Sequence, residues 1–338
     1  MLRLARGFSS ALVLAFVLAT AALVGCAAGG DGWDARSVQQ TVTGVPFQPI
    51  LVNSNLGVGK NRLALALFDA NQEFINVADV TATFYHLDKE PTGEPKNAKQ
   101  VGQATLIART LKSVGAARLE GSAMASRLPG RVAAPDVDAH LGHDSTVFAA
   151  VVDLDRAGFW GASLDVKVGD QTFKGLRLVF AVQERTAEPR VGDPAPAIKQ
   201  RVASDVQSLA EIDTSPAPNA DLHRITVAQA LASGKPSVVA IVTPAFCQTR
   251  FCGPALEQVV LPAHHEFGDR VNVMHIEPYD IAKAKGGKLE LVPAIEDWKI
   301  LSEPIIFVVG KDGLVTAKFE GIMDYAELRE AILATLAR

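Results

Sequence analysis

Cysteine, aromatic residues and positive charge are all scarce in this chain of 338 residues, which has three cysteines and 6% aromatic residues. Lysine and arginine total 33 against 37 aspartates and glutamates, for a formal net charge of -4. Without a basic excess there is no electrostatic footprint for a polyanion, so we expect no nucleic-acid partner. The 48% hydrophobic and 21% charged residues are typical of a globular protein, and the length suits two domains.

The N-terminus has the layout of a secretory signal. Arg3 and Arg6 precede an apolar run at residues 11–24, which is shorter than the about 20 residues that a membrane-spanning helix needs. The run leads into LVGC, which resembles the bacterial lipoprotein box and implies lipidation of Cys26. Ala27 follows, so no aspartate signals inner-membrane retention. We expect an exported protein, lipid-anchored to the bacterial cell envelope on the periplasmic or surface side, with the outer membrane left open; the alternative is a plain signal peptide or a short anchor.

Three segments are predicted after the signal peptide at residues 1–26. Residues 27–44 are small and polar, which indicates a flexible tether. Residues 45–187 hold short alternating apolar runs separated by Gly, Pro, Asn and Asp, a pattern that predicts an all-β immunoglobulin-like sandwich. AGFWGASLDV at 157–166 resembles exported immunoglobulin-like modules. The predicted strands fall at 50–52, 62–68, 80–87, 146–154, 162–168 and 176–182.

Residues 188–338 begin with a proline-containing linker. The pattern after the linker predicts secondary-structure elements in the order β, α, β, α, β, β, α. Four features resemble the thioredoxin-like redoxin family: VGDPAP, a strand that runs into AFCQTRFCGP, Glu303-Pro304 before IIFVV, and a terminal β-hairpin followed by a helix. The resemblance implies an α/β thioredoxin-like fold in which Pro304 is a cis-proline that faces the active cysteine. The predicted fold class is therefore two domains, an all-β immunoglobulin-like sandwich followed by an α/β thioredoxin-like fold.

The other two cysteines, Cys247 and Cys252, form a C-x4-C pair, and exported proteins retain disulfides. In a regular helix, residues five apart are about 140° out of phase and more than about 8 Å apart, whereas a disulfide needs Cα atoms within about 7 Å. Gly253 and Pro254 mark a helix start, so we expect the pair to meet across the preceding loop. The helix N-terminus favours a thiolate there, and Arg250 adds positive charge.

The resemblance implies that this pair exchanges thiols and disulfides with a protein substrate, with no cofactor and with an unidentified redox partner. Two registers compete for the nucleophile. If Phe246-Cys247 matches the aromatic-Cys dipeptide of the family, Cys247 leads and Cys252 resolves; if FCGP matches W-C-G-P, Cys252 leads, as helix-terminus electrostatics also favour. We prefer the first register because it retains a cysteine pair. Glu303, before Pro304, would place a carboxylate near the thiols, which opposes thiolate formation.

Several alternatives stay open. Thr249-x-x-Cys252 matches part of the peroxiredoxin pattern, which allows a thiol peroxidase. A copper-delivering redoxin would use the cysteines with His275 as a third ligand. His140 and His143 are a further weak metal candidate in a loop, and we commit to no metal site. The last alternative is a non-catalytic binding protein whose disulfide is structural.

Overall fold

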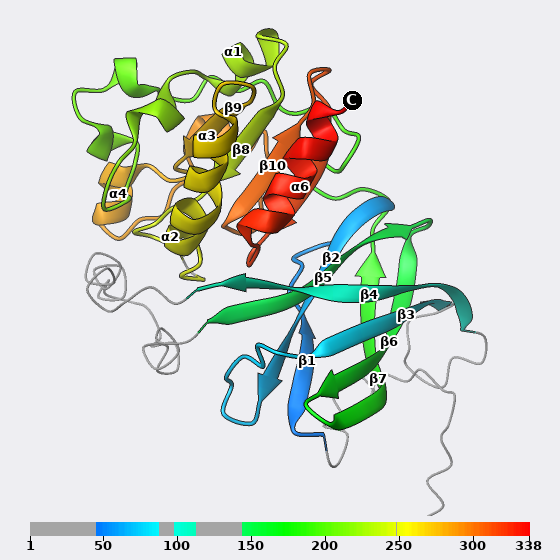
Figure 1. Ribbon diagram of the computed structural model, residues 1–338. Helices are drawn as coiled ribbons and strands as arrows, with labels where there is room; N and C mark the ends of the chain where they lie inside the picture. The colour runs from blue at the N-terminus through cyan, green and yellow to red at the C-terminus, as the bar shows by residue number, and fades with distance from the viewer. Residues whose placement is uncertain (1–44, 88–97, 113–143, 248) are drawn as a thin grey trace, which may run out of the picture. The chain divides into compact units, whose positions relative to one another are not determined.

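The computed structural model describes residues 45–87, 98–112, 144–247 and 249–338 (Figure 1). Cys26, His140 and His143 lie outside the described residues, as do the predicted signal peptide and tether. The described residues all fall within one compact unit of the chain. Among them, no helix combines the length and the apolar character that crossing a membrane requires.

Seven strands form one antiparallel sheet: β1 (Phe47–Leu51), β2 (Gly59–Asp69), β3 (Asp79–Leu87), β4 (Lys99–Leu111), β5 (Ser145–Leu154), β6 (Gly158–Val168) and β7 (Gln171–Val182). Their order in the sheet is β1-β2-β5-β4-β3-β6-β7. β4 pairs with β3 through residues 99–106 and with β5 through residues 107–111, so one strand links the two halves of the sheet. The rings of Phe47 on β1 and Phe173 on β7 make edge contact with centroids 5.1 Å apart. The sheet therefore curves until its two edge strands meet.

A second sheet consists of β8 (Ser237–Ile241), β9 (Asn272–Ile276), β10 (Ile305–Val309) and β11 (Val315–Glu320). Its order is β11-β10-β8-β9, with β8 and β9 parallel and the other pairs antiparallel. The helices are short: α1 (Val227–Ala232), α2 (Cys252–Ala255), α3 (Leu261–Phe267), α4 (Ile281–Lys285), α5 (Pro293–Glu296) and α6 (Tyr325–Leu336). In the described segment before α1 lie the 3-10 turns η5 (Ala203–Asp205), η6 (Leu209–Glu211) and η7 (Ala220–His223), and a π-turn, η8 (Leu256–Val260), joins α2 to α3.

Strand β2 is buried on both faces. Its sequence RLALALF alternates large and small residues, and every residue from Asn61 to Leu67 is buried. The leucines lie in the core of the seven-stranded sheet. Ala64 and Ala66 point to the opposite face, into a core that also contains residues of β8, β10 and α6. Because alanine is small, the second layer approaches β2 closely, and one apolar core unites residues of both sheets.

The fold class predicted from the sequence is wrong. Over the described residues the structure is mostly β, with a seven-stranded and a four-stranded sheet, and its longest helix, α6, has 12 residues. It is not an immunoglobulin-like sandwich followed by an α/β thioredoxin-like fold. The first seven strands form one curved sheet, and the core on the alanine face of β2 belongs to both sheets. Local alternation locates strands, but it does not determine which other elements cover their two faces.

Individual elements follow the sequence more closely than the fold class does. Strands β1, β2, β3, β5, β6 and β7 fall at the six predicted runs. Thr226 caps α1 in a capping box with Gln229, the spacing that this motif requires. The sequence does not predict β4, because most of its first half is exposed and lacks apolar alternation. It also does not predict α4, a helix of five residues that includes Lys283 and Lys285.

A buried arginine connects β2 to the C-terminal helix. The side chain of Arg62 is 5% exposed and donates to both carboxylate oxygens of Glu327, at 2.7 and 2.9 Å. It also donates to the carbonyl of Ile322 at 2.9 Å and lies over the ring of Phe319. The side chain of Asp324 caps α6 by accepting the N–H of Glu327. The carboxylate of Glu327 is thus available to pair with the guanidinium across the shared core.

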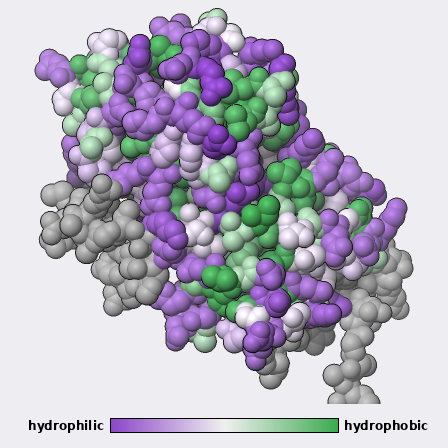
Figure 2. Space-filling model, in the orientation of Figure 1, coloured by the Kyte–Doolittle hydropathy of each residue, from purple (hydrophilic) through white to green (hydrophobic). Residues whose placement is uncertain are grey.

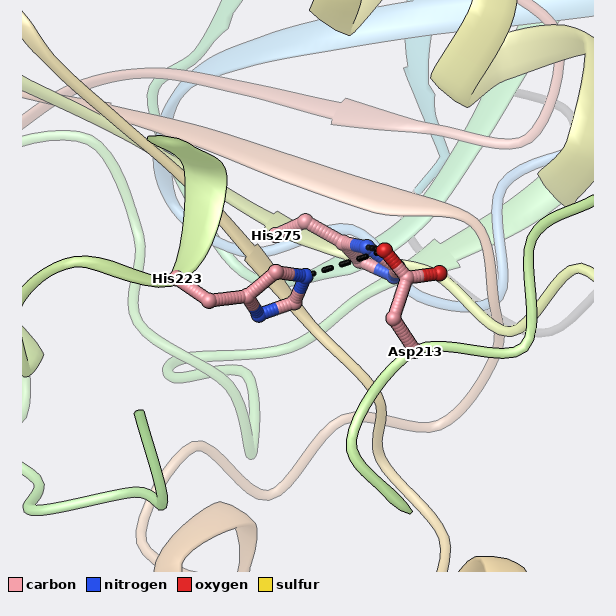
Figure 3. A group of neighbouring side chains, drawn as sticks. All are labelled: Asp213, His223 and His275. Atoms are coloured by element: carbon pink, nitrogen blue, oxygen red, sulfur yellow. Dashed lines mark hydrogen bonds and ion pairs between the residues drawn. The ribbon is translucent and has the colours of Figure 1, made fainter. Parts of the chain in front are cut away.

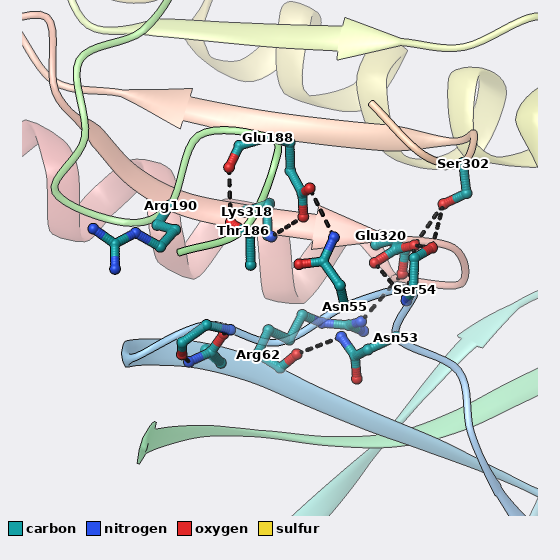
Figure 4. Close-up of polar contacts among 12 residues, drawn as sticks. Asn53, Ser54, Asn55, Arg62, Thr186, Glu188, Arg190, Ser302, Lys318 and Glu320 are labelled. Carbon is teal, nitrogen blue, oxygen red and sulfur yellow. Dashed lines mark hydrogen bonds and ion pairs between the residues drawn. The ribbon is translucent and has the colours of Figure 1, made fainter. Parts of the chain in front are cut away.

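Polar contacts around this ion pair join the segment before β2 to β11 (Figure 4). Lys318 on β11 pairs with Glu188 at 2.7 Å, and Glu188 also accepts from the side chain of Asn55 at 2.8 Å. Glu320, at the end of β11, accepts from Ser54. Glu188 is buried although it belongs to the predicted linker. The start of that linker is therefore held by paired charges.

The surface drawn in Figure 2 mixes hydrophilic and hydrophobic residues. The exposed large apolar side chains come from different strands and loops, and they are Ile50, Val77, Val101, Ile107, Val151, Leu301, Leu314 and Leu333. Scattered exposed apolar residues are normal on a folded protein, so we assign no function to them.

Replacing Arg62 tests the importance of the buried ion pair. We expect Arg62→Met to lower the free energy of unfolding by about 3–5 kcal/mol, because Glu327 would remain buried without its main partner. The double variant Arg62→Met/Glu327→Leu should recover part of this loss, since both charges are then absent. Urea denaturation followed by circular dichroism measures both values.

The matched control is Arg156→Met. Arg156 pairs with its neighbour Asp155 on the surface, and both side chains are 50% exposed. Exposed pairs of this kind contribute about 0–1 kcal/mol. Equal losses for the Arg62 and Arg156 variants would contradict the assigned role of Arg62.

Candidate active site

Cys247 and Cys252 form a disulfide across the loop between β8 and α2. Their Cα atoms are 5.9 Å apart. Cys252 is the first residue of α2, whereas Cys247 lies in the loop before the helix. The pair therefore meets at a helix start, as the spacing predicts, and not along one regular helix.

The two sulfurs differ in exposure and in polar contacts. Cys252 is 0% exposed and belongs to the shared apolar core, whereas Cys247 is partly exposed at the edge of this core. The backbone N–H of Cys252 donates to Sγ of Cys247 at 3.3 Å. N–H groups in the first turn have no acceptor within their own helix, so this donor stabilises negative charge on Cys247. The geometry favours Cys247 as the sulfur that a substrate reaches.

Thr249 connects Cys247 to the peptide before Pro304. Its Oγ1 lies 3.3 Å from Sγ of Cys247 and donates to the carbonyl of Glu303 at 3.0 Å, across 54 positions of sequence. Glu303 and Pro304 are both buried, and the peptide between them is cis, as the family resemblance implies. The start of β10 therefore lies close to the cysteine loop.

Each Phe-Cys dipeptide is anchored by its phenylalanine. Phe246 is buried together with Ile281 and Ala284 of α4. Phe251 packs against the shared core, and its ring makes edge contact with Phe74 at a centroid distance of 6.5 Å. Phe74 follows β2 in the chain, so the loop after this strand contributes a wall to the cysteine loop.

The remaining predicted site residues shape the backbone. Arg250 has a φ of 63°, in the left-handed region that few non-glycine residues occupy. Pro254 lies in the first turn of the helix, where its missing N–H is not needed. A Cβ built on Gly253 would meet no atom within 4 Å, so this position has room for a side chain. Farther on, the π-turn η8 ends at Val260, two residues before Pro262, which lacks the N–H that a regular helix would use.

A second group of chemically functional side chains is buried beside β8 and consists of Asp213, His223 and His275 (Figure 3). Oδ2 of Asp213 lies 3.0 Å from Nε2 of His223 and 3.4 Å from Nδ1 of His275. On the other side of its ring, Nε2 of His275 lies 3.1 Å from the carbonyl oxygen of Val242, which follows β8. The polar contacts of His275 are thus with Asp213, Val242 and Glu277, whereas the sequence suggested it as a copper ligand beside the cysteines.

Burial and charge perturb the titration of this group. Burial would raise the pKa of Asp213, but the hydrogen bond from His223 and the proximity of His275 hold it well below its usual value. Burial lowers the pKa of His223. Burial also acts to lower the pKa of His275, but the carboxylate of Asp213 outweighs it, and the pKa is raised. The carboxylate of Asp213 is therefore ionised, and its negative charge favours a positive charge beside Oδ2, where the two imidazole rings face it.

Glu277 extends this polar group toward the cysteine loop. Burial raises the pKa of Glu277 to about 7, against a neighbouring imidazole and the hydroxyls of Thr243 and Thr214 that donate to its carboxylate. Oγ1 of Thr214 also accepts the N–H of Ala245 at 3.0 Å. Ala245 is two residues before Cys247, so a continuous set of hydrogen bonds links the buried carboxylate to the start of the loop.

Sequence reasoning missed Asp213, His223 and Glu277. Two of them lie in a polar stretch of 3-10 turns whose pattern has no helical or strand period. The sequence feature that could have indicated this buried group is on β9, an apolar strand that contains His275 and is followed by Glu277. Ionisable groups in such a position need buried partners, and the partners come from a distant segment that the sequence does not identify.

No family model and no curated protein sequence matches this chain. Among solved structures, one match is the crystal structure of the Lin-41 filamin domain, at 10% sequence identity and a TM-score of 0.17. The match covers 42% of this chain and 97% of that one. A TM-score this low does not establish a shared fold, so the functional argument depends on the site itself.

The difference in exposure predicts unequal reactivity in the reduced protein. We expect iodoacetamide to modify Cys247 faster than Cys252 by at least about tenfold, because the thiol must reach solvent to react. Mass spectrometry of peptides after timed labelling measures both rates. Gly253→Ala is the matched control and should retain the same preference, since the added Cβ has room. Faster labelling of Cys252 would contradict the assignment of Cys247 as the accessible thiol.

Proposed function

We propose that the protein is a thiol–disulfide oxidoreductase that acts through Cys247 and Cys252. The observation that carries the proposal is the asymmetry of the pair at a helix start. Cys247 is partly exposed and accepts a first-turn N–H, while Cys252 is buried within disulfide distance. An accessible sulfur whose thiolate is stabilised, beside a protected second sulfur, is the arrangement that thiol exchange requires.

The reaction proceeds in two exchanges. In the reducing direction, the Cys247 thiolate attacks a substrate disulfide, forms a mixed disulfide and releases one substrate thiolate, which takes up a proton. Cys252 then loses its proton and attacks the Cys247 sulfur, which releases the second substrate thiolate and forms the Cys247–Cys252 disulfide. Two electrons pass from the cysteine pair to the substrate, and a separate redox partner restores the dithiol. The oxidising direction is the reverse.

Thr249 helps to separate this proposal from a peroxidase. A peroxidase that uses the Thr249-x-x-Cys252 pattern needs the hydroxyl at Cys252 and needs that sulfur to meet peroxide. Instead, the hydroxyl of Thr249 lies next to Cys247, and Cys252 is fully buried. The position of the Thr249 hydroxyl and the burial of Cys252 both favour exchange at Cys247.

We also propose that the protein acts outside the cytoplasm, anchored by lipid on Cys26. The support is the sequence alone: a charged start, an apolar run and LVGC. When the chain is expressed in a bacterium fed radiolabelled palmitate, we expect label in the wild type and none in Cys26→Ser. Unlabelled wild-type protein would contradict the anchor and would leave the chemistry of the other cysteines unaffected.

Trapping of substrates tests the exchange reaction. In Cys252→Ser, the mixed disulfide on Cys247 has no resolving thiol, so we expect it to accumulate on partner proteins. Non-reducing electrophoresis of envelope extracts, followed by mass spectrometry, identifies the trapped species. Cys247→Ser is the matched control and should trap little, because its remaining thiol is buried.

A redox titration distinguishes catalysis from a structural role. A catalytic pair should equilibrate with glutathione or dithiothreitol buffers in the range of known oxidoreductases, above about -270 mV. A potential below about -300 mV together with no trapped species in either variant would show that the disulfide is structural.

A further inference from the structure

The buried group of Asp213, His223 and His275 has the composition of a metal centre. The three residues come from separate segments: Asp213 follows η6, His223 ends η7, and His275 lies on β9. Their exposed fractions are 2%, 3% and 1%. The ligand atoms that they offer all lie within 4.8 Å of one another. Figure 3 shows both rings directed at the same carboxylate.

One ring nitrogen in this group lacks a hydrogen bond. Nε2 of His275 faces the carbonyl oxygen of Val242 at 3.1 Å, and because a carbonyl can only accept, this nitrogen carries a proton. In the neutral ring, Nδ1 is then a bare lone pair. It is buried, makes no hydrogen bond to any described residue, and lies 3.4 Å from Oδ2 of Asp213. A cation must lie between these two electron-rich atoms: either a proton on Nδ1, in keeping with the raised pKa of His275, or a metal ion that replaces this proton.

The surrounding contacts orient these ligands. Oδ1 of Asp213 accepts the N–H of Ser215 at 2.7 Å, which turns Oδ2 toward the two rings. The bond from His275 to a backbone carbonyl resembles the outer contacts that fix metal-binding histidines in one tautomer. The carboxylate and one ring are thus held in place from outside the group.

The distances suit a small ion. With bonds of about 2.0–2.1 Å, neighbouring ligand atoms around tetrahedral zinc are about 3.3 Å apart. The carboxylate oxygen of Asp213 lies 3.0 and 3.4 Å from the nitrogens of His223 and His275. Two imidazoles with one carboxylate suit Zn²⁺ and neighbouring first-row ions better than Ca²⁺ or Mg²⁺, which prefer oxygen ligands.

We propose that Asp213, His223 and His275 bind one divalent transition-metal ion, with Zn²⁺ as the expected occupant. The ligands are Oδ2 of Asp213, Nε2 of His223 and Nδ1 of His275. Because all three are buried, the ion enters as the chain folds and holds the polar segment at η6 and η7 against β9. None of the ligands is a cysteine, so the test of this site does not depend on the proposed redox function.

Cobalt titration tests the site on the full chain. The protein carries Cys26→Ser and is kept oxidised, so that no thiol binds metal. It is refolded from denaturant after chelation and titrated with Co²⁺. We expect one equivalent to bind with visible d–d absorption, and we expect Zn²⁺ to displace it. No stoichiometric binding by this protein would overturn the proposal, whatever the variants do.

Variants locate the ion. Asp213→Asn and His223→Gln should each weaken Co²⁺ binding by at least about tenfold. His265→Gln, at an exposed histidine, is the matched control and should bind as the parent does. Binding that survives in both ligand variants, or that is lost in the control, would place the ion elsewhere. If a ligand variant does not fold, the melting temperature of the parent protein tests whether the metal binds. Zn²⁺ should raise this temperature, and a chelator should reverse the shift.

Discussion

Burial of both faces of β2 constrains the rest of the structure. On one face its leucines fill the core of the seven-stranded sheet, and on the other Ala64 and Ala66 admit β8, β10 and α6 into a common core. Arg62 lies two residues before Ala64, on the same face, where it reaches Glu327. A slip of one residue would bring leucines into space sized for alanine and would direct the guanidinium into the wrong core. The register of β2 therefore fixes the packing of the second sheet.

The cysteine loop depends on the same packing. Cys252 and Phe251 lie in or against the shared core, and Phe74, just beyond β2, contacts the ring of Phe251. One cysteine is thereby fixed in the interior, while Cys247 lies at its edge. In the proposed exchange, the exposed sulfur changes partners and the buried one stays in place. This division of roles results from packing, because the sequence presents both cysteines in the same Phe-Cys context.

The sequence predicted local features better than their assembly. Six strands and the loop geometry of the cysteine pair follow from alternation and spacing. The fold class was wrong, since no local pattern reveals that one core contains residues of both sheets. The first half of β4 is mostly exposed and gave no apolar signal. The sequence did not identify Asp213 and His223, because their partner His275 lies far along the chain on β9. Only folding brings the three residues together.

Two of the buried charged groups, the Arg62–Glu327 pair and the group around Asp213, differ in how completely protein atoms pair with their charges. The guanidinium of Arg62 meets a carboxylate and a backbone carbonyl, so its desolvation is offset by direct contacts. In the other group, Asp213 is held ionised, yet the facing nitrogen of His275 forms no hydrogen bond to the described residues. A buried anion with two nitrogen atoms directed at it requires positive charge from a proton or from a metal ion. A proton on each ring satisfies the two nitrogens separately, whereas a metal ion binds both nitrogens and the carboxylate together. The convergence of all three atoms on one point is the arrangement that the proposed metal ion requires.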